Sequence, residues 1–255
     1  MSGKIDKIRI SAVRYANTYP FIWGLRESSF EKRAIIETDH PSECAAKLIS
    51  GRADIGLTPV AALPFIKKYN IISDYCIGAN GEVRTVMLLS NCPFSEVRVI
   101  NLDYRSRSSV SLAKVLAKNM WKKKYQWFNT TEQFDFINIG QDEAVVLIGD
   151  QCFEFENMFR FKLDLASEWK KLTGLPFVFA CWAANREIDT EFMTDFNNAL
   201  KKGVDNIDLV AKEFGKNSVV GEEVLRSYLT NNIDYSFDNE KQKAMKLFLG
   251  LLDKL

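Results

Sequence analysis

Residues 50–60 read SGRADIGLTPV and connect an amphipathic helix to a short buried strand. The helix is predicted over residues 42–50, because apolar side chains recur at helical spacing and a glycine follows as a typical left-handed end. The strand is predicted over residues 53–57. Ligands of open α/β sheets bind at the carboxyl ends of strands, so Thr58 and Pro59 are candidate walls of a cleft. An ordinary helix-to-strand connection is the alternative interpretation.

Strands and helices alternate along the rest of the chain, which indicates an α/β fold with mainly parallel sheets covered by helices. Strands are predicted over residues 7–13, 34–37, 53–57, 75–79, 85–89, 97–101, 125–128, 144–148 and 177–182. Helices are predicted over residues 42–50, 60–69, 109–123, 165–172 and 190–202, with three more after residue 205. These last helices are expected to pack back on an earlier sheet.

The alternation also predicts two lobes. The extended runs at residues 85–89 and 177–182 flank a block rich in strand–helix–strand units, and we expect them to cross between the lobes. Residues 1–89 and 184–255 then form a discontinuous first lobe, and residues 90–183 form the second. The ligand cleft is expected between them.

Composition excludes several classes of protein. The chain has 255 residues, 47% of them apolar and 26% charged, which is typical of soluble globular proteins. A net charge of +1 argues against nucleic acid or an anionic membrane surface as the main partner. No apolar run approaches the ~20 residues of a membrane span, and the first ten residues do not resemble a signal peptide. We therefore expect a cytoplasmic protein.

The thiol and imidazole groups argue against metal and triad chemistry. The five cysteines are widely spaced and odd in number, which favours free thiols over disulfides or a zinc site. The one histidine, His40, directly precedes a proline at a helix start, so a helix cap or a surface position is expected for it. The chain contains no Walker loop and no dinucleotide fingerprint.

Polar side chains follow two of the predicted strands. Asn17 offers an acceptor and two donors after the first strand, and Arg14 can pair with a carboxylate. Arg84 and Thr85 place a guanidinium and a hydroxyl beside the expected crossing. The alternative for the segment around Asn17 is a simple turn. The alternative for Arg84 and Thr85 is an exposed arginine next to a threonine of the strand.

A helix start and a strand end complete the candidate cleft. Ser108 or Ser109 caps the helix predicted over residues 109–123, and its free N–H groups suit a carboxylate or phosphate. Capping alone is the alternative. Gly149 and Asp150 follow another strand, where Asp150 either bonds a substrate hydroxyl or caps the next turn. These residues predict a binder of a small, anionic organic molecule.

Six motifs, in this order, carry a resemblance to a known family: YANTYPF (15–21), GRADIGLTPVA (51–61), GEVRTV (81–86), SRSSV (106–110), LIGD (147–150) and DLASEWKKLTGLPFVFA (164–180). Together they resemble the menaquinone-biosynthesis family with the type 2 periplasmic-binding-protein fold. The similarity is greatest to its chorismate dehydratase branch, which belongs to the futalosine route, and it covers essentially the whole chain.

The chain departs from the family pattern at three positions. Ala16 stands where the family usually has Leu, Thr85 where it often has Ser, and Ser108 where it commonly has Thr. The two hydroxyl positions keep their hydrogen-bonding groups. The sister branch, the dihydroxynaphthoate synthases, shows a Pro-Asn-Asp-Thr sequence and a pocket histidine, and this chain has neither in its motifs.

The resemblance implies conversion of chorismate to 3-[(1-carboxyvinyl)oxy]benzoate by loss of water, with no cofactor and no metal. It implies catalytic roles for Asn17 and Thr85. The substrate-binding residues that it implies are Arg14, Thr58, Pro59, Arg84, Arg107, Ser108, Ser109, Gly149 and Asp150. Either a side chain or the substrate's own carboxylate takes the proton.

Two other classes compete with this interpretation. A non-catalytic solute-binding protein of the same fold is expected to carry a signal peptide or a lipid-anchored cysteine near its N-terminus. The substrate-binding domain of a transcriptional regulator requires an attached helix-turn-helix. Another enzyme of the same pathway is the remaining alternative.

Overall fold

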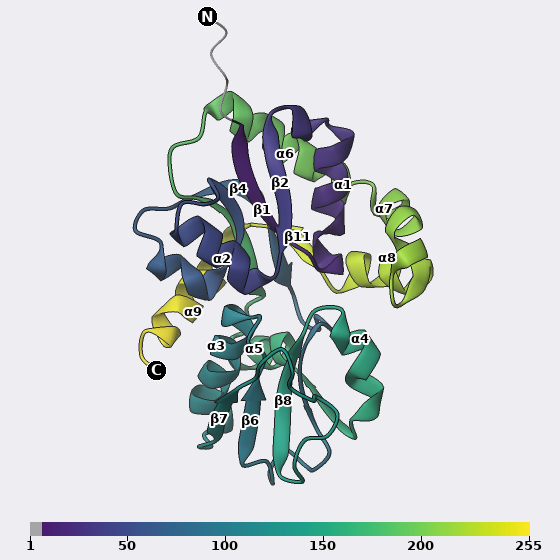
Figure 1. Ribbon diagram of the computed structural model, residues 1–255. Coiled ribbons are helices and arrows are strands. Elements are labelled where there is room, and N and C mark those ends of the chain that lie inside the picture. The colour runs from purple at the N-terminus through teal and green to yellow at the C-terminus, as the bar shows by residue number, and fades with distance from the viewer. Residues whose placement is uncertain (1–6) are drawn as a thin grey trace, which may run out of the picture.

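The strands collect into two separate sheets in the computed structural model, which describes residues 7–255 (Figure 1). Six strands form a sheet in the order β11-β4-β10-β3-β1-β2, which we call the first half of the molecule. Five strands form a sheet in the order β7-β6-β8-β5-β9, the second half. The predicted α/β fold with helices on mixed sheets is confirmed. The expectation that no signal peptide is present falls partly on residues 1–6, which lie outside the described residues.

The strands of the first half are β1 (Ile8–Val13), β2 (Ala34–Asp39), β3 (Ile55–Pro59), β4 (Asn70–Ala79), β10 (Phe177–Ala184) and β11 (Asp234–Ser236). Those of the second half are β5 (Val86–Ser90), β6 (Val99–Leu102), β7 (Gln126–Asn129), β8 (Glu143–Ile148) and β9 (Phe161–Asp164). Four of the nine strand pairings within residues 7–255 are parallel and five are antiparallel. The antiparallel share is larger than predicted, because β5, β10 and β11 run against their neighbours.

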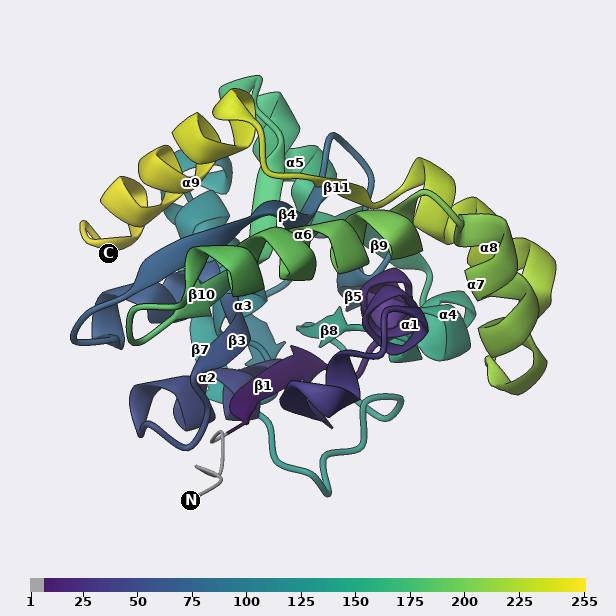
Figure 2. The same cartoon turned by 90° about the horizontal axis from the view of Figure 1, so that it is seen from above.

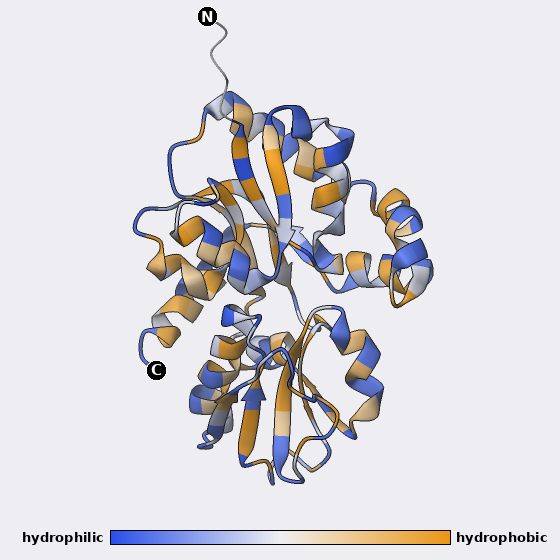
Figure 3. Cartoon of the chain, in the orientation of Figure 1, coloured by the Kyte–Doolittle hydropathy of each residue, from blue (hydrophilic) through white to orange (hydrophobic). Residues whose placement is uncertain are grey.

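The α-helices of the first half are α1 (Tyr19–Glu27), α2 (Pro41–Ile49), α6 (Thr190–Val204), α7 (Ile207–Phe214) and α8 (Gly221–Asn231). Those of the second half are α3 (Arg107–Leu116), α4 (Gln151–Phe155) and α5 (Leu165–Thr173). α9 (Asn239–Leu252) contacts both β10 and α3, and so lies along both halves. α6 packs on β4 and against α1, as the view from above shows (Figure 2). Hydrophobic residues gather along the strands, whereas the helices carry mixed faces (Figure 3).

The strands beside the two chain crossings lie in the opposite half from the predicted one. β5, expected in the first lobe, pairs with β8 and β9 of the second half. β10, expected in the second lobe, pairs with β3 and β4 of the first half. Both runs are buried along their whole length and serve as sheet strands. The chain therefore crosses in the short segments 80–85 and 174–176.

Other elements also differ from the sequence expectation, which does not include α1, α4 or β9. The helix predicted over residues 60–69 is a short 3₁₀ helix, η3 (Val60–Phe65), because Pro64 stands inside it and cannot donate a backbone hydrogen bond. β11 was not predicted within the helical tail, since three residues are too few to show a strand pattern. The three helices predicted after residue 205 are confirmed as α7, α8 and α9.

The β3 strand begins and ends two residues later than predicted, and this shift decides where Thr58 lies. Thr58 is inside the strand and fully buried, and its hydroxyl donates to the Gly56 carbonyl at 3.1 Å. Successive side chains of a strand point to opposite faces. Pro59 and Thr58 therefore face opposite sides of the sheet.

The contact between α1 and α6 depends on two glycines that allow a close backbone approach. A Cβ atom on Gly203 would overlap the Pro20 carbonyl oxygen, and one on Gly24 would overlap the Ala199 carbonyl oxygen. Each methyl group would meet backbone rather than a flexible side chain. The two helices would have to separate to admit it.

We expect Gly203→Ala to lower the free energy of unfolding by about 1–3 kcal/mol or more, the usual cost of overpacking. The matched control is Gly250→Ala in α9, where an added Cβ meets nothing within 4 Å. That change should raise the free energy of unfolding by about 0.5–1 kcal/mol, because alanine loses less backbone entropy in a helix. Urea unfolding measures both, and equal stability of the two variants would contradict the packing argument.

Candidate functional site

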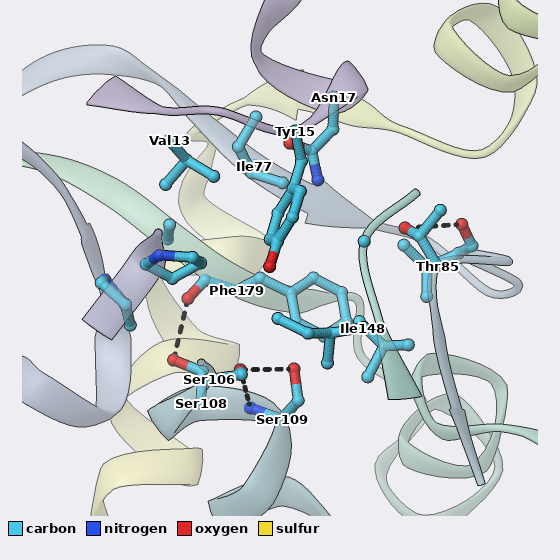
Figure 4. A pocket seen from close by; sticks show the side chains of 16 residues that line it. Val13, Tyr15, Asn17, Ile77, Thr85, Ser106, Ser108, Ser109, Ile148 and Phe179 are labelled. Carbon is cyan, nitrogen blue, oxygen red and sulfur yellow. Dashed lines mark hydrogen bonds between the residues drawn. The ribbon is translucent and has the colours of Figure 1, made fainter. Parts of the chain in front are cut away.

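A cavity, here called the central cavity, lies between the two halves (Figure 4). It is lined by Val13, Tyr15, Asn17, Pro41, Pro59, Ile77, Val83, Thr85, Val86, Ser106, Ser108, Ser109, Ile148, Gly149, Phe179 and Ala180. All of these residues are uncharged and most are apolar. Such a wall can enclose a ring while a few polar groups fix its orientation.

Six residues predicted from the sequence line this cavity: Asn17, Pro59, Thr85, Ser108, Ser109 and Gly149. They come from η1 (Ala16–Thr18), β3, the segment before β5, the start of α3 and the segment after β8. The fold thus brings together five of the motifs that the sequence singles out. Their roles toward a substrate remain predictions.

Tyr15 fills the middle of the view in Figure 4, with its ring among the lining residues. Its hydroxyl lies 3.4 Å from Nδ1 of His40, and burial raises its pKa. A Cβ atom on Gly149 would lie 2.7 Å from the Tyr15 ring, and Gly149 has a φ of +69°. Gly149 therefore leaves room for the aromatic ring in addition to supplying a left-handed turn.

Asn17 reaches the central cavity from the opposite side of this ring. Its backbone carbonyl accepts a hydrogen bond from the Tyr235 hydroxyl at 3.0 Å. Its side-chain Oδ1 accepts from the Thr18 hydroxyl at 3.2 Å. One hydrogen bond thus holds the backbone of Asn17 and another its side-chain oxygen. The side-chain NH₂ group can act as a donor.

The start of α3 forms the wall of the second half and is built from three serines. The N-cap is Ser106 and not Ser108 or Ser109 as predicted, because α3 begins at Arg107, two residues earlier than expected. The Oγ of Ser106 accepts from the Ser109 amide at 3.1 Å and donates to the Ser109 hydroxyl at 2.9 Å. Ser108 donates to the Phe179 carbonyl at 2.9 Å and accepts from the Ala61 amide at 3.2 Å. Ser108 therefore also joins the two halves.

Thr85 is almost fully buried, and its Oγ1 lies 2.7 Å from the hydroxyl of Tyr228. Tyr228 belongs to α8 of the first half, whereas Thr85 directly precedes β5 of the second. This hydrogen bond is the shortest one that the structure shows between the two halves at the cavity wall.

Three predicted arginines lie away from the central cavity. Arg14 is exposed at the end of β1. Arg84 lies 3.4 Å from the carboxylate of Glu156 in the second half. Arg107 is exposed and its guanidinium stacks 5.6 Å above the ring of Phe65. The structure does not bring these three arginines together at the cavity. Their contacts with a substrate stay predictions.

Asp150 contacts the first half rather than the cavity. Its carboxylate accepts from the backbone amide of Ala16 at 3.1 and 3.3 Å. Burial raises the pKa of Asp150 to about 6, and the hydrogen bond from Ala16 acts in the opposite direction. A carboxyl group with this pKa changes its charge near neutral pH.

A buried ion pair lies below the start of α3. Arg105 donates to both oxygens of Asp103, at 2.8 and 2.7 Å, and its backbone carbonyl accepts from the Ser42 amide at 3.1 Å. The guanidinium charge is thereby neutralised inside the second half. The pair also fixes a third contact between the halves.

Sequence interpretation does not assign two polar lining residues, Tyr15 and Ser106. Ser106 carries a signal, because it precedes Ser109 by three residues at a helix start, the spacing of an N-cap bond. Tyr15 stands within the first motif, two residues before Asn17. The apolar lining residues, such as Phe179, carry no local signal. The sequence pattern of a buried strand is the same whether its side chains face the core or a cavity.

Within residues 7–255, no group of three or more His, Cys, Asp or Glu side chains could hold a metal ion. In the same part of the chain, the helices are too short or too polar to span a membrane.

Comparisons with known proteins agree with this geometry. A family profile described as menaquinone biosynthesis matches residues 8–254. The chorismate dehydratase of Thermus thermophilus is 24% identical, with 94% of this chain and 93% of that protein covered. The chorismate dehydratase of Campylobacter jejuni is 23% identical, with 97% and 95% covered.

Solved structures show the same fold at lower identity. Protein AF1704 of Archaeoglobus fulgidus superimposes with a TM-score of 0.74 at 14% identity, covering 99% of this chain and 98% of that chain. The periplasmic aliphatic sulphonate binding protein SsuA of Escherichia coli gives a TM-score of 0.56 at 15% identity, covering 98% and 87%. The fold is thus that of the periplasmic binding proteins, and the match over residues 8–254 shows that the chain belongs to the menaquinone-biosynthesis family.

Proposed function

We propose that this protein is a chorismate dehydratase, a carbon–oxygen lyase that converts chorismate to 3-[(1-carboxyvinyl)oxy]benzoate and water in the futalosine route of menaquinone biosynthesis. The observation that carries the proposal is the central cavity, which is uncharged and contains hydroxyl and amide groups on both sides of an apolar middle. The two chorismate dehydratases among the relatives support the choice of reaction. The cytoplasm, where a biosynthetic intermediate is available, is the proposed location.

The chemistry of chorismate suits these walls. The molecule is a small ring acid with two carboxylates and one ring hydroxyl, and the mostly apolar walls carry a few polar groups that can orient such a ligand. Apolar residues such as Ile148 and Phe179 can contact the ring. Ser106, Ser109 and the amides at the start of α3 can hold a carboxylate, because a helix start favours negative charge.

The reaction requires orientation more than a reactive side chain. The C–H bond next to the hydroxyl-bearing carbon breaks, its electron pair forms the new ring double bond, and the C–O bond breaks. The proton and the hydroxyl group leave together as water, so atoms and charge balance. Because the product ring is aromatic, a weak base is sufficient, and either a side chain or a substrate carboxylate can accept the proton.

In this proposal Asn17 and Thr85 align the bonds that break. Asn17 donates from the first half and Thr85 from the second, so a bound ring lies between them. Closure of the halves excludes water and strengthens each hydrogen bond. Asp150 contributes indirectly, through its bond to Ala16, by holding the halves together.

A non-catalytic binding protein for a small anionic ligand is the second candidate. The observation that favours it is the shared fold with the sulphonate binding protein, which shows architecture alone. Another enzyme of the same pathway is a third possibility. Product formation separates all of these.

Purified protein incubated with chorismate should form a product lighter by one water molecule, detected by mass spectrometry. Calorimetric binding of chorismate without any product would support the binding protein instead. Neither binding nor product from folded protein would overturn the assignment of substrate.

Asn17→Ala and Thr85→Val should each lower kcat/KM by about 10²-fold, the usual scale when a positioning contact is lost. Both variants should remain folded by circular dichroism. Asn198→Ala is the matched control, because Asn198 is exposed on α6 and away from the cavity. Near-normal turnover by both site variants would contradict their assigned roles.

Asp150→Asn should raise the free energy of unfolding by about 1–3 kcal/mol at pH 7.5, because the wild type must bury a carboxylate there. The folded-state pKa of about 6 lies above the usual 3.8, so the folded state binds the proton more tightly. The advantage of the variant should therefore shrink as pH falls from about 6 and vanish below about 4. Urea unfolding at several pH values measures it.

Asp135→Asn provides a control of opposite sign. Hydrogen bonds, first from the Asn138 side chain, lower the pKa of Asp135. Its carboxylate therefore stabilises the folded state above the usual pKa and loses this effect as pH falls. A pH-independent difference for Asp150→Asn would contradict the proposed effect of burial.

A further inference from the structure

Tyr228 touches the second half of the molecule with both its ring and its hydroxyl group. The residue is fully buried in α8, which belongs to the first half. Its hydroxyl lies 2.7 Å from Oγ1 of Thr85, and its ring meets that of Phe153 in α4 edge-on, with centroids 5.1 Å apart. Both contacts cross the gap between the halves.

The same hydroxyl also interacts with Asn17. Burial raises the pKa of Tyr228, whereas hydrogen bonds with the side chains of Thr85 and Asn17 lower it. Figure 4 shows Asn17 at the top of the view and Thr85 below it to the right. Tyr228 is thus hydrogen-bonded to Thr85 and lies near Asn17, the two residues to which the proposed function assigns catalysis.

The available donors and acceptors set the direction of the hydrogen bonds that run from the Asn17 amide through the Tyr228 hydroxyl to Thr85. Oδ1 of Asn17 already accepts from the Thr18 hydroxyl at 3.2 Å, which leaves the amide NH₂ as a donor to Tyr228. Tyr228 can then donate to Thr85. The Val83 carbonyl is 3.5 Å from Oγ1 of Thr85, at the limit of a hydrogen bond. Among the described residues, this long contact with Val83 is then the one acceptor that the structure gives the proton of Thr85, so a closer oxygen of a ligand can replace it.

We propose that Tyr228 is a positioning residue that directs the Thr85 hydroxyl toward the leaving hydroxyl of the substrate once the two halves have closed. This inference rests on the proposed function and adds to it a residue from the C-terminal helices. Hydrogen bonds in a buried chain polarise one another, so Thr85 becomes a better donor when Tyr228 donates to it.

Loss of the Tyr228 hydroxyl leaves Thr85 free to turn its proton toward the Val83 carbonyl or toward Asn17. Substrate can still enter and bind, because the walls of the cavity are unchanged. The rate of water loss falls, because the leaving hydroxyl no longer meets an oriented donor. The effect should therefore appear in kcat rather than in KM.

Tyr228→Phe keeps the ring and its contact with Phe153 while it removes the hydroxyl. We expect kcat with chorismate to fall by about 10-fold, the scale of one buried hydrogen bond, and KM to stay within about 3-fold. Tyr75→Phe is the matched control: Tyr75 is half-buried in β4 with Lys201 and Asp205 as its charged neighbours.

The double variant Tyr228→Phe/Thr85→Val tests whether the two hydroxyls act as one unit. If Tyr228 acts through Thr85, the double variant should be no slower than Thr85→Val alone. A purely structural role predicts that the two effects on kcat multiply. Unfolding in urea, measured for all four proteins, separates a loss of stability from a loss of turnover.

Two results would overturn the inference, and they differ from each other. Wild-type protein that does not convert chorismate overturns both the proposed function and the role of Tyr228. Active wild-type protein with an unchanged kcat in Tyr228→Phe, or with multiplying effects in the double variant, overturns the role of Tyr228 alone.

Discussion

Buried polar groups that find their hydrogen-bond partners across the boundary between two sheets hold the two halves of this molecule together. The Ser108 hydroxyl bonds Ala61 and Phe179 of the other half, and the Asp150 carboxylate bonds the amide of Ala16. A buried polar group without a partner costs about 1–3 kcal/mol. Each half therefore satisfies buried polar groups of the other half, and the walls of the cavity depend on this pairing.

The two buried or half-buried arginines nearest the cavity are already paired with carboxylates. Arg105 is bound to Asp103, and Arg84 lies beside Glu156. In the proposed function, hydroxyls, amides and the start of α3 hold the anionic substrate rather than a cation. Dehydration of a dianion to a dianion and water leaves the charge of the substrate unchanged, so uncharged walls suit both sides of the reaction.

Much of the fold could be predicted from the sequence, because periodicity is a local property. The strand near residues 53–57, the helix start at Ser108 and the helical tail were all predicted to within a few residues. Positions that depend on exact register were not. Because the strand ends two residues later than predicted, Thr58 lies inside it and its hydroxyl bonds the Gly56 carbonyl. Pro59 lines the cavity. A sequence motif cannot predict this difference, because it matches residue types and does not show which face of the sheet each side chain occupies.

The largest gap between sequence and structure concerns the C-terminal segment, whose helical pattern gave no reason to place it at the site. The folded chain returns there twice: Tyr235 bonds the backbone carbonyl of Asn17, and Tyr228 bonds Thr85. Tyr228 is buried in α8 and Tyr235 in β11, and in a sequence pattern a buried aromatic residue looks like ordinary core. A buried tyrosine differs from other core aromatics because its hydroxyl requires a hydrogen-bond partner. In an α/β chain whose first half is discontinuous, the returning segment is therefore the place to look for residues that support the site.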